Sequence, residues 1–115
     1  MIDWTRVEEL RAEIGCEDFA EVVELFLDEV DGVVARLQCA PDPTRFEDDL
    51  HFLKGSAWNL GFEAFGALCQ NGERLASAGN PDSVNIEPII ACYLASRATF
   101  LEHGAAAPKP GASAA

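Results

Sequence analysis

The sequence has few basic residues, since 8 Lys and Arg stand against 20 Asp and Glu, for a formal net charge of −12 at pH 7. Phosphate backbones and anionic membrane surfaces are bound by clusters of Lys and Arg, so this balance argues against nucleic acid and membranes as partners. The chain has no apolar run near the roughly 18 residues of a membrane helix, and it begins without the basic and apolar segments of a signal peptide. We therefore expect a cytoplasmic protein.

Other patterns are missing as well. No run of residues alternates with period two, so no strand is predicted. No GxxxxGK[ST] loop or nucleotide-binding glycine pattern occurs, so the chain should not hydrolyse ATP or phosphorylate itself. The four cysteines form no CxxC pair, which favours reduced thiols over a zinc site: Cys16, Cys39, Cys69 and Cys92.

Apolar residues make up 49% of the 115 residues, enough for one folded domain. Helices are predicted from the Asp3 cap to about residue 14, from 17 or 18 to 39, from 44 to 60, from 63 to 78, and from 83 or 85 to 102. Gly15, the prolines at 41 and 43, Gly61 and the run 79–81 separate them.

Each of the four long helices carries an apolar stripe at helical spacing. The predicted inward residues are Phe19, Val23, Phe26, Val30, Val33 and Leu37; Phe46, Leu50, Leu53, Ala57 and Leu60; Phe65, Leu68, Cys69 and Leu75; and Ile86, Ile90, Tyr93, Leu94 and Phe100. Short connections favour an all-α fold, an antiparallel up-down four-helix bundle with a short additional N-terminal helix across one end. The bundle is expected over residues 1–103, followed by a flexible low-complexity tail over 104–115.

The third predicted helix holds an unusual combination of residues around His51. Residues three, four and seven apart share one face of a helix. The face of His51 is separate from the apolar stripe and also holds Glu47, Asp48, Lys54, Gly55 and Trp58. His51 is therefore predicted to point into solvent from the middle of a rigid helix.

The neighbours of His51 suit a phosphoryl group. Lys54 places an ammonium one turn away, where it can offset the nearly two negative charges of a phosphoryl group. Gly55 costs about 1 kcal/mol relative to Ala inside a helix, and its missing side chain predicts a notch for an approaching protein. Trp58, if exposed, is an aromatic anchor typical of interfaces. Taken singly, each residue has an ordinary structural explanation: a surface His, a helix-contact Gly and a core Trp.

The run HFLKGSAWNLG, residues 51–61, resembles the signature of histidine phosphotransfer (HPt) domains. There a phosphorylatable His is followed at three, four and five residues by Lys, Gly and a small residue, and then by Leu-Gly at the helix end. Leu68, Cys69 and Glu73 and the acidic and apolar run 24–29 also resemble the family. The resemblance covers about residues 3–102.

The resemblance implies a role for each matching residue. His51 is the phosphoacceptor, Lys54 the phosphate-facing cation and Gly55 the clearance residue. In support, Glu73 can hold the imidazole. Ser56 is expected from its small size, and not from the resemblance, to sustain helix packing.

Four further residues, Phe52, Trp58, Glu47 and Asp48, are predicted to contact the partner. The chain departs from the family at two positions. Phe52 replaces a small or polar residue, and Gly72 replaces an apolar residue, which should loosen packing in the fourth helix.

The implied function is that of a phosphorelay intermediate in two-component signalling. His51 would exchange a phosphoryl group with the aspartate of response-regulator receiver domains, and a hybrid sensor histidine kinase is a further candidate partner. The receiver would supply the acidic pocket, the Mg²⁺ and a lysine. The chain itself would need no cofactor and would act as a phosphotransfer protein without kinase or ATPase activity.

Two other interpretations remain open at this point. The chain could be a non-catalytic helical adaptor or dimerisation module in which His51 is incidental. A metal site is the other, because Asp48-x-x-His51 has the carboxylate-x-x-His spacing of di-iron bundles. That site needs a second such pair, and Phe100 stands where the carboxylate before His103 would be, so no metal is expected. His103 also lacks a following Lys and Gly and is not predicted to be a second acceptor.

Overall fold

The computed structural model describes residues 2–103, so the predicted tail over 104–115 lies outside the described residues. Its five α-helices are α1 (Trp4–Ile14), α2 (Cys16–Cys39), α3 (Phe46–Leu60), α4 (Glu63–Ser77) and α5 (Ile86–His103), and two short 3₁₀ turns are η1 (Pro43–Arg45) and η2 (Pro81–Ser83). Within residues 2–103 the only extended pairing is an isolated bridge between Ile2 and Phe62. The predicted all-α fold is confirmed.

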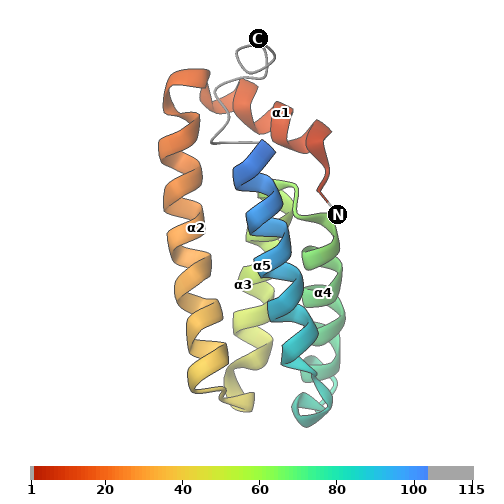
Figure 1. The fold of residues 1–115 in the computed structure, drawn as a ribbon. Coiled ribbons are helices and arrows are strands. Elements are labelled where there is room, and N and C mark those ends of the chain that lie inside the picture. Colours follow the sequence, from red (N-terminus) through yellow and green to blue (C-terminus); the bar gives the residue numbers. More distant parts are fainter. Residues whose placement is uncertain (1, 104–115) are drawn as a thin grey trace.

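The four long helices lie side by side and alternate in direction along the chain, and α1 crosses the end of the bundle where α2 begins (Figure 1). The connection between α3 and α4 is only two residues long, Gly61 and Phe62. Such a short connection forces the two helices to be antiparallel neighbours. This pair matters most for function, because it carries the residues of the candidate site.

Local signals in the sequence explain where helices end. The Asp3 side chain accepts a hydrogen bond from the backbone N–H of Arg6 and caps α1. Gly15, with φ of 102°, separates α1 from α2, and Gly61, with φ of 82°, ends α3. At Gly61 a Cβ atom would stand 2.7 Å from the carbonyl oxygen of Asp3, so the start of α1 requires glycine here. The backbone N–H of Asp3 also donates to the carbonyl oxygen of Gly61, which joins the start of α1 to the α3–α4 connection.

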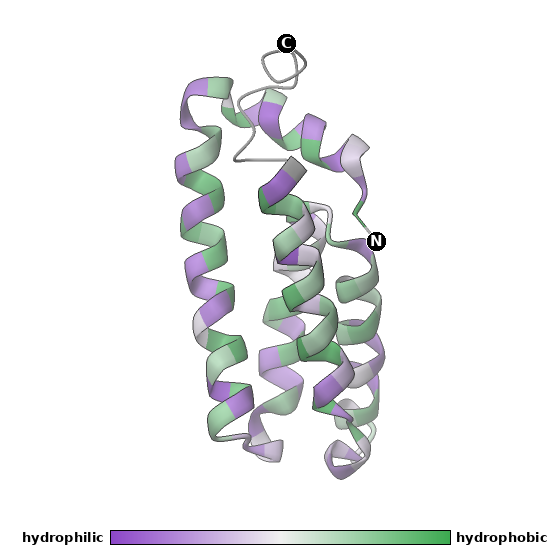
Figure 2. Cartoon of the chain, in the orientation of Figure 1, coloured by the Kyte–Doolittle hydropathy of each residue, from purple (hydrophilic) through white to green (hydrophobic). Residues whose placement is uncertain are grey.

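The core lies between the green inner faces of the helices in Figure 2. The predicted stripe of α3 is buried in full. In α2, Leu27 and Val34 are buried, whereas the predicted Phe26 and Val33 are only partly buried. Both sets follow helical spacing, so sequence periodicity alone does not decide between them.

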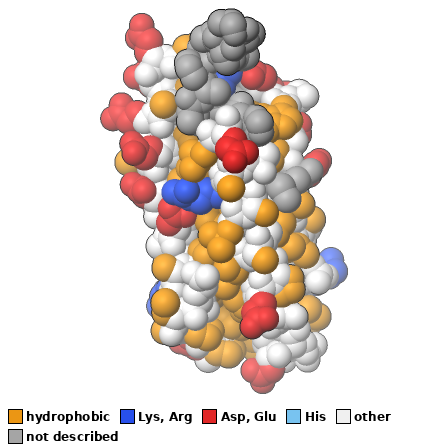
Figure 3. Space-filling model, viewed as in Figure 1, with side chains coloured by type: hydrophobic (Ala, Val, Ile, Leu, Met, Phe, Trp, Pro, Cys, Tyr) orange, Lys and Arg blue, Asp and Glu red, His pale blue; other side chains and the backbone are white. Residues whose placement is uncertain are grey.

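The stripe predicted for α5 is wrong at one position. Leu94 is exposed, and Ile89 and Ser96 are buried instead. The helix is apolar on almost every side, so its sequence shows no clear polar face to mark the outside. Hydrophobic side chains accordingly run along the surface over α5 (Figure 3).

Two groups of polar side chains join α2 to α3 and α5. Asp31 accepts hydrogen bonds from the Tyr93 hydroxyl and from the Arg97 guanidinium, which joins α2 to α5. Arg36 donates to the buried Asp49 at 2.7 Å, which joins α2 to α3. The second pair holds the turn of α3 that precedes the candidate site.

Candidate functional site

His51 stands on the solvent side of α3. Its side chain is 69% exposed, whereas Leu50 and Leu53 on either side of it are fully buried. These two leucines hold the helix against the core and keep the imidazole outside. The predicted exposure of His51 is confirmed.

A carboxylate on the next helix fixes the orientation of the imidazole. Glu73 Oε2, on α4, lies 2.8 Å from His51 Nδ1. The other oxygen of the same carboxylate, Oε1, lies 2.7 Å from Lys54 Nζ. The Glu73 side chain is only 18% exposed, whereas the imidazole that it holds is 69% exposed, so the carboxylate is shielded from water and the ring is not. The structure thus brings together three of the residues that the sequence singled out.

The bridge determines which ring nitrogen is free. Burial alone would raise the pKa of Glu73, but hydrogen bonds and charge from Lys54 and His51 together hold that pKa below its usual range. An ionised carboxylate only accepts hydrogen bonds, so Nδ1 carries the proton that is shared with Glu73. In the neutral ring, Nε2 then keeps its lone pair. The nitrogen on the far side of the ring from Glu73 is therefore the one whose lone pair is free.

Gly72 explains how α4 approaches α3 closely enough for this bridge. A Cβ atom at Gly72 would stand 2.9 Å from Leu50 Cδ1 and 3.4 Å from side-chain atoms of Val84 and Ile89. The neighbours fill the space that a side chain would need. The expectation that Gly72 loosens packing is therefore wrong, because this buried glycine permits a close contact between the helices.

Gly55 lies one turn beyond His51 and is exposed. No atom from elsewhere in the described chain lies within 4 Å of the place its Cβ would occupy. The predicted open space beside the imidazole is present, and its use as clearance for a partner stays a prediction. Ser56 is buried, on the packed side of the helix.

The residues predicted to contact a partner lie on different sides of α3. Trp58 is 42% exposed and rests against Gly66 of α4, where a Cβ would collide with the indole. It is therefore a half-exposed residue and does not belong to the core cluster. Phe52 is 38% exposed and faces α2, where it lines a shallow groove with Gly32 and Val33.

Glu47 and Asp48, the other two predicted contact residues, are exposed in the first turn of α3. Within residues 2–103, no group of three or more His, Cys, Asp or Glu side chains is placed to hold a metal ion. The acidic pair instead makes the surface before His51 negative.

Sequence reasoning missed several residues near the site. The Arg36–Asp49 pair joins residues far apart in the sequence, and the apolar neighbours of Asp49 were the available signal for the burial of its side chain. A groove of about 440 Å³ beside the site was also missed, and its lining includes Gln70, Arg74 and Ser77 of α4. The position of Arg74 directly after Glu73 was the available signal.

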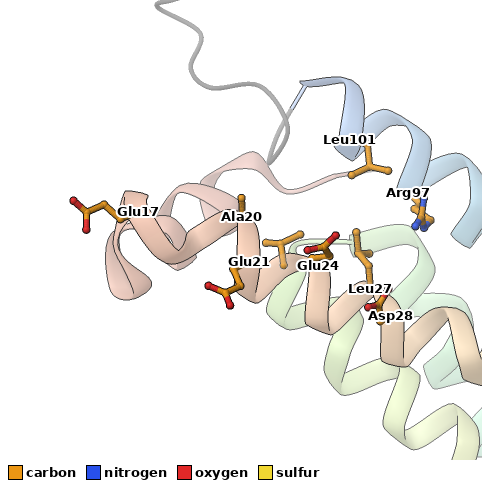
Figure 4. A pocket seen from close by; sticks show the side chains of 9 residues that line it. Glu17, Ala20, Glu21, Glu24, Leu27, Asp28, Arg97 and Leu101 are labelled. Atoms are coloured by element: carbon orange, nitrogen blue, oxygen red, sulfur yellow. The ribbon is translucent and has the colours of Figure 1, made fainter.

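A second groove, of about 570 Å³, lies between α2 and α5 and takes no part in the site. Its lining includes Glu17, Glu21, Glu24 and Asp28 of α2 and Arg97 and Leu101 of α5, and in Figure 4 the side chains of Glu17 and Glu21 point away from α5. Neither His51 nor any residue that holds it lines this groove. This groove is therefore separate from the α3–α4 face that carries His51.

An exposed, oriented imidazole on a helical hairpin is the arrangement of a phosphohistidine carrier, and comparison with protein families agrees with it. The family model of the Hpt domain matches residues 21–102, so the chain belongs to the Hpt domain family. Searches of curated proteins and of solved structures found no significant match. Membership in this family means histidine phosphotransfer in two-component signalling. None of the helices described here is long and apolar enough to cross a membrane.

Proposed function

We propose that the chain carries a phosphoryl group on Nε2 of His51 and exchanges it with the aspartate of response-regulator receiver domains. The observation that carries this proposal is the Nδ1 hydrogen bond to Glu73, which leaves Nε2 exposed with its lone pair free. Hpt domains generally interact with receiver domains and kinases, which supports receivers as the partners. A hybrid sensor histidine kinase is a further candidate for the source of the phosphoryl group.

The transfer step follows from the geometry of the ring. The Nε2 lone pair attacks the phosphorus of an aspartyl phosphate in line with the leaving oxygen. One N–P bond forms, one P–O bond breaks, and the aspartate leaves as a carboxylate. The ring becomes a phosphoimidazolium whose positive charge faces the Glu73 carboxylate. No proton has to leave Nδ1, so the reverse transfer uses the same contacts.

The residues around the ring have supporting roles in this proposal. Lys54 holds the second oxygen of Glu73 and stands one turn from the incoming phosphoryl group, where its charge offsets repulsion. Gly55 leaves room for the receiver to bring its aspartate to the ring. The acidic pocket and the Mg²⁺ belong to the receiver, and the chain supplies the acceptor ring and a docking face.

Labelling from a phosphorylated receiver tests the proposal. The chain has two histidines, so His103→Gln is a matched control for His51→Gln. We expect His51→Gln to abolish labelling while circular dichroism shows unchanged helical content, and His103→Gln to be labelled like the wild type. ATP alone should label none of the three proteins. Labelling that persists in His51→Gln would support the alternative of a helical adaptor in which His51 is incidental.

A further inference from the structure

The groove beside the site on the α4 side is continuous with the residues that hold His51. It is lined by Lys54, Gln70, Glu73, Arg74, Ser77 and Ala78. Lys54 and Glu73 are the ion pair that orients the imidazole. A protein that brings an aspartyl phosphate to His51 therefore passes close to the other side chains of the groove.

Arg74 is unusual among the cations of the chain. Five others each pair with a carboxylate: Arg6, Arg11, Arg36, Lys54 and Arg97. Within residues 2–103, Arg74 and Arg45 have no carboxylate at ion-pair distance, and Arg74 donates only to the side-chain amide oxygen of Asn71. Its guanidinium is exposed, so it is available to a partner.

The negative charge before His51 indicates a role for the Arg74 guanidinium. Glu47 and Asp48 make the face before His51 negative, and an aspartyl phosphate brings close to two further negative charges. Approach of that group is therefore opposed on the side of Glu47 and Asp48. A guanidinium in the adjoining groove reduces this repulsion and can bind a carboxylate with two parallel hydrogen bonds.

We propose that Arg74, flanked by Gln70 and Ser77, docks an acidic side chain of the receiver beside its phosphorylated aspartate. The inference rests on the proposed function and adds the α4 groove to the docking surface. Contacts of this kind act on encounter and on the choice of partner more than on the chemistry at the ring.

The test measures the second-order rate constant of transfer from a purified phosphorylated receiver domain that labels the wild-type chain. Arg74→Gln should lower that constant about 3- to 10-fold at low salt, and Arg74→Lys should recover part of the loss. The difference from wild type should shrink in 0.5 M salt, because exposed charges are then screened.

Arg45→Gln is the matched control, because Arg45 is also exposed and without a carboxylate at ion-pair distance among the described residues, but it lies in η1 and does not line the α4 groove. It should leave the rate constant within about twofold of wild type. A loss as large as that of Arg74→Gln would assign the effect to net charge and overturn the inference.

A small donor separates docking from chemistry. Phosphoramidate needs no docking surface, so Arg74→Gln and wild type should be labelled by it at equal rates. If Arg74→Gln is labelled more slowly than wild type by phosphoramidate as well, Arg74 acts on the acceptor ring. If Arg74→Gln is labelled by the receiver as fast as wild type, the groove is not used. Either result overturns this inference and leaves the proposed function standing. A wild-type chain labelled on His51 by neither donor would overturn the proposed function together with it.

Discussion

Replacing Glu73 with Gln tests the part of the site that sequence reasoning defined least. The amide keeps the shape of the side chain and can still accept the Nδ1 hydrogen bond through its oxygen. It lacks the negative charge that faces the phosphoimidazolium, and it leaves Lys54 without its ionic partner. The perturbation therefore removes charge and preserves position.

The expected loss follows from the 2.8 Å contact between Glu73 Oε2 and His51 Nδ1. A hydrogen bond to a charged group contributes about 1–2 kcal/mol more than one between neutral groups. Since Glu73 is mostly shielded from water, we expect much of this difference to appear in the barrier. That predicts a transfer rate about 5- to 30-fold lower at saturating receiver.

Rapid-quench measurement with a phosphorylated receiver gives this rate, and titration calorimetry gives receiver affinity, which should stay within about twofold. Glu63→Gln is the control, because Glu63 is exposed near the start of the same helix. A Glu73→Gln rate equal to wild type, or a loss equal to that of Glu63→Gln, would refute the positioning role of the carboxylate.

The same variant predicts a pH dependence of stability. Burial raises the pKa of Glu73, but the contacts with Lys54 and His51 outweigh burial and lower this pKa in the folded chain. A carboxyl group whose pKa is lowered by folding stabilises the folded chain at pH values above its ordinary pKa of about 4.3. This stabilisation is lost as the pH falls through the pKa of the folded state. Urea unfolding should therefore find Glu73→Gln less stable than wild type at pH 7, and the difference should shrink below about pH 4.

Two further substitutions test the packing and the docking face. Both Gly72→Ala and Gly32→Ala gain helix propensity, but only at Gly72 would the new Cβ press on Leu50, so Gly72→Ala should be about 1–3 kcal/mol less stable than Gly32→Ala in the same urea titration. Trp58→Ala should weaken receiver binding by about 1–2 kcal/mol in calorimetry, and Leu94→Ala, another exposed apolar residue, should not; equal affinities would exclude Trp58 as an anchor.

Helix boundaries could be predicted well from local chemistry. Asp3, Gly15 and Gly61 act through their own side chains or backbone angles, so the sequence near each of them suffices. Which residues face the core was predicted well for α3 and less well for α2 and α5. Leu94 was misplaced because α5 lacks a polar face, and only its position against the other helices decides which side is buried.

In the candidate site, too, features that lie within one helix could be predicted from the sequence, whereas contacts between helices could not. The exposure of His51 and the open space at Gly55 follow from helical spacing within α3. The contact between His51 and Glu73 depends on how closely α4 approaches, and that distance depends on Gly72, whose effect the sequence reasoning judged in the wrong direction. The resemblance to a family indicated Glu73, but neither spacing nor composition did.

The position of Lys54 changes how the chemistry of the site is understood. The sequence presented it as a cation facing a phosphoryl group, whereas in the unphosphorylated chain it lies 2.7 Å from Glu73. On the proposed function, a phosphoryl group on Nε2 competes with Glu73 for this one ammonium. If the Lys54 ammonium moves toward the phosphoryl group, its ion pair with Glu73 becomes weaker, and Glu73 is the carboxylate that stabilises the charged ring. On that proposal, this competition limits the stability of the phosphorylated state, which suits a relay that must release the phosphoryl group as well as accept it.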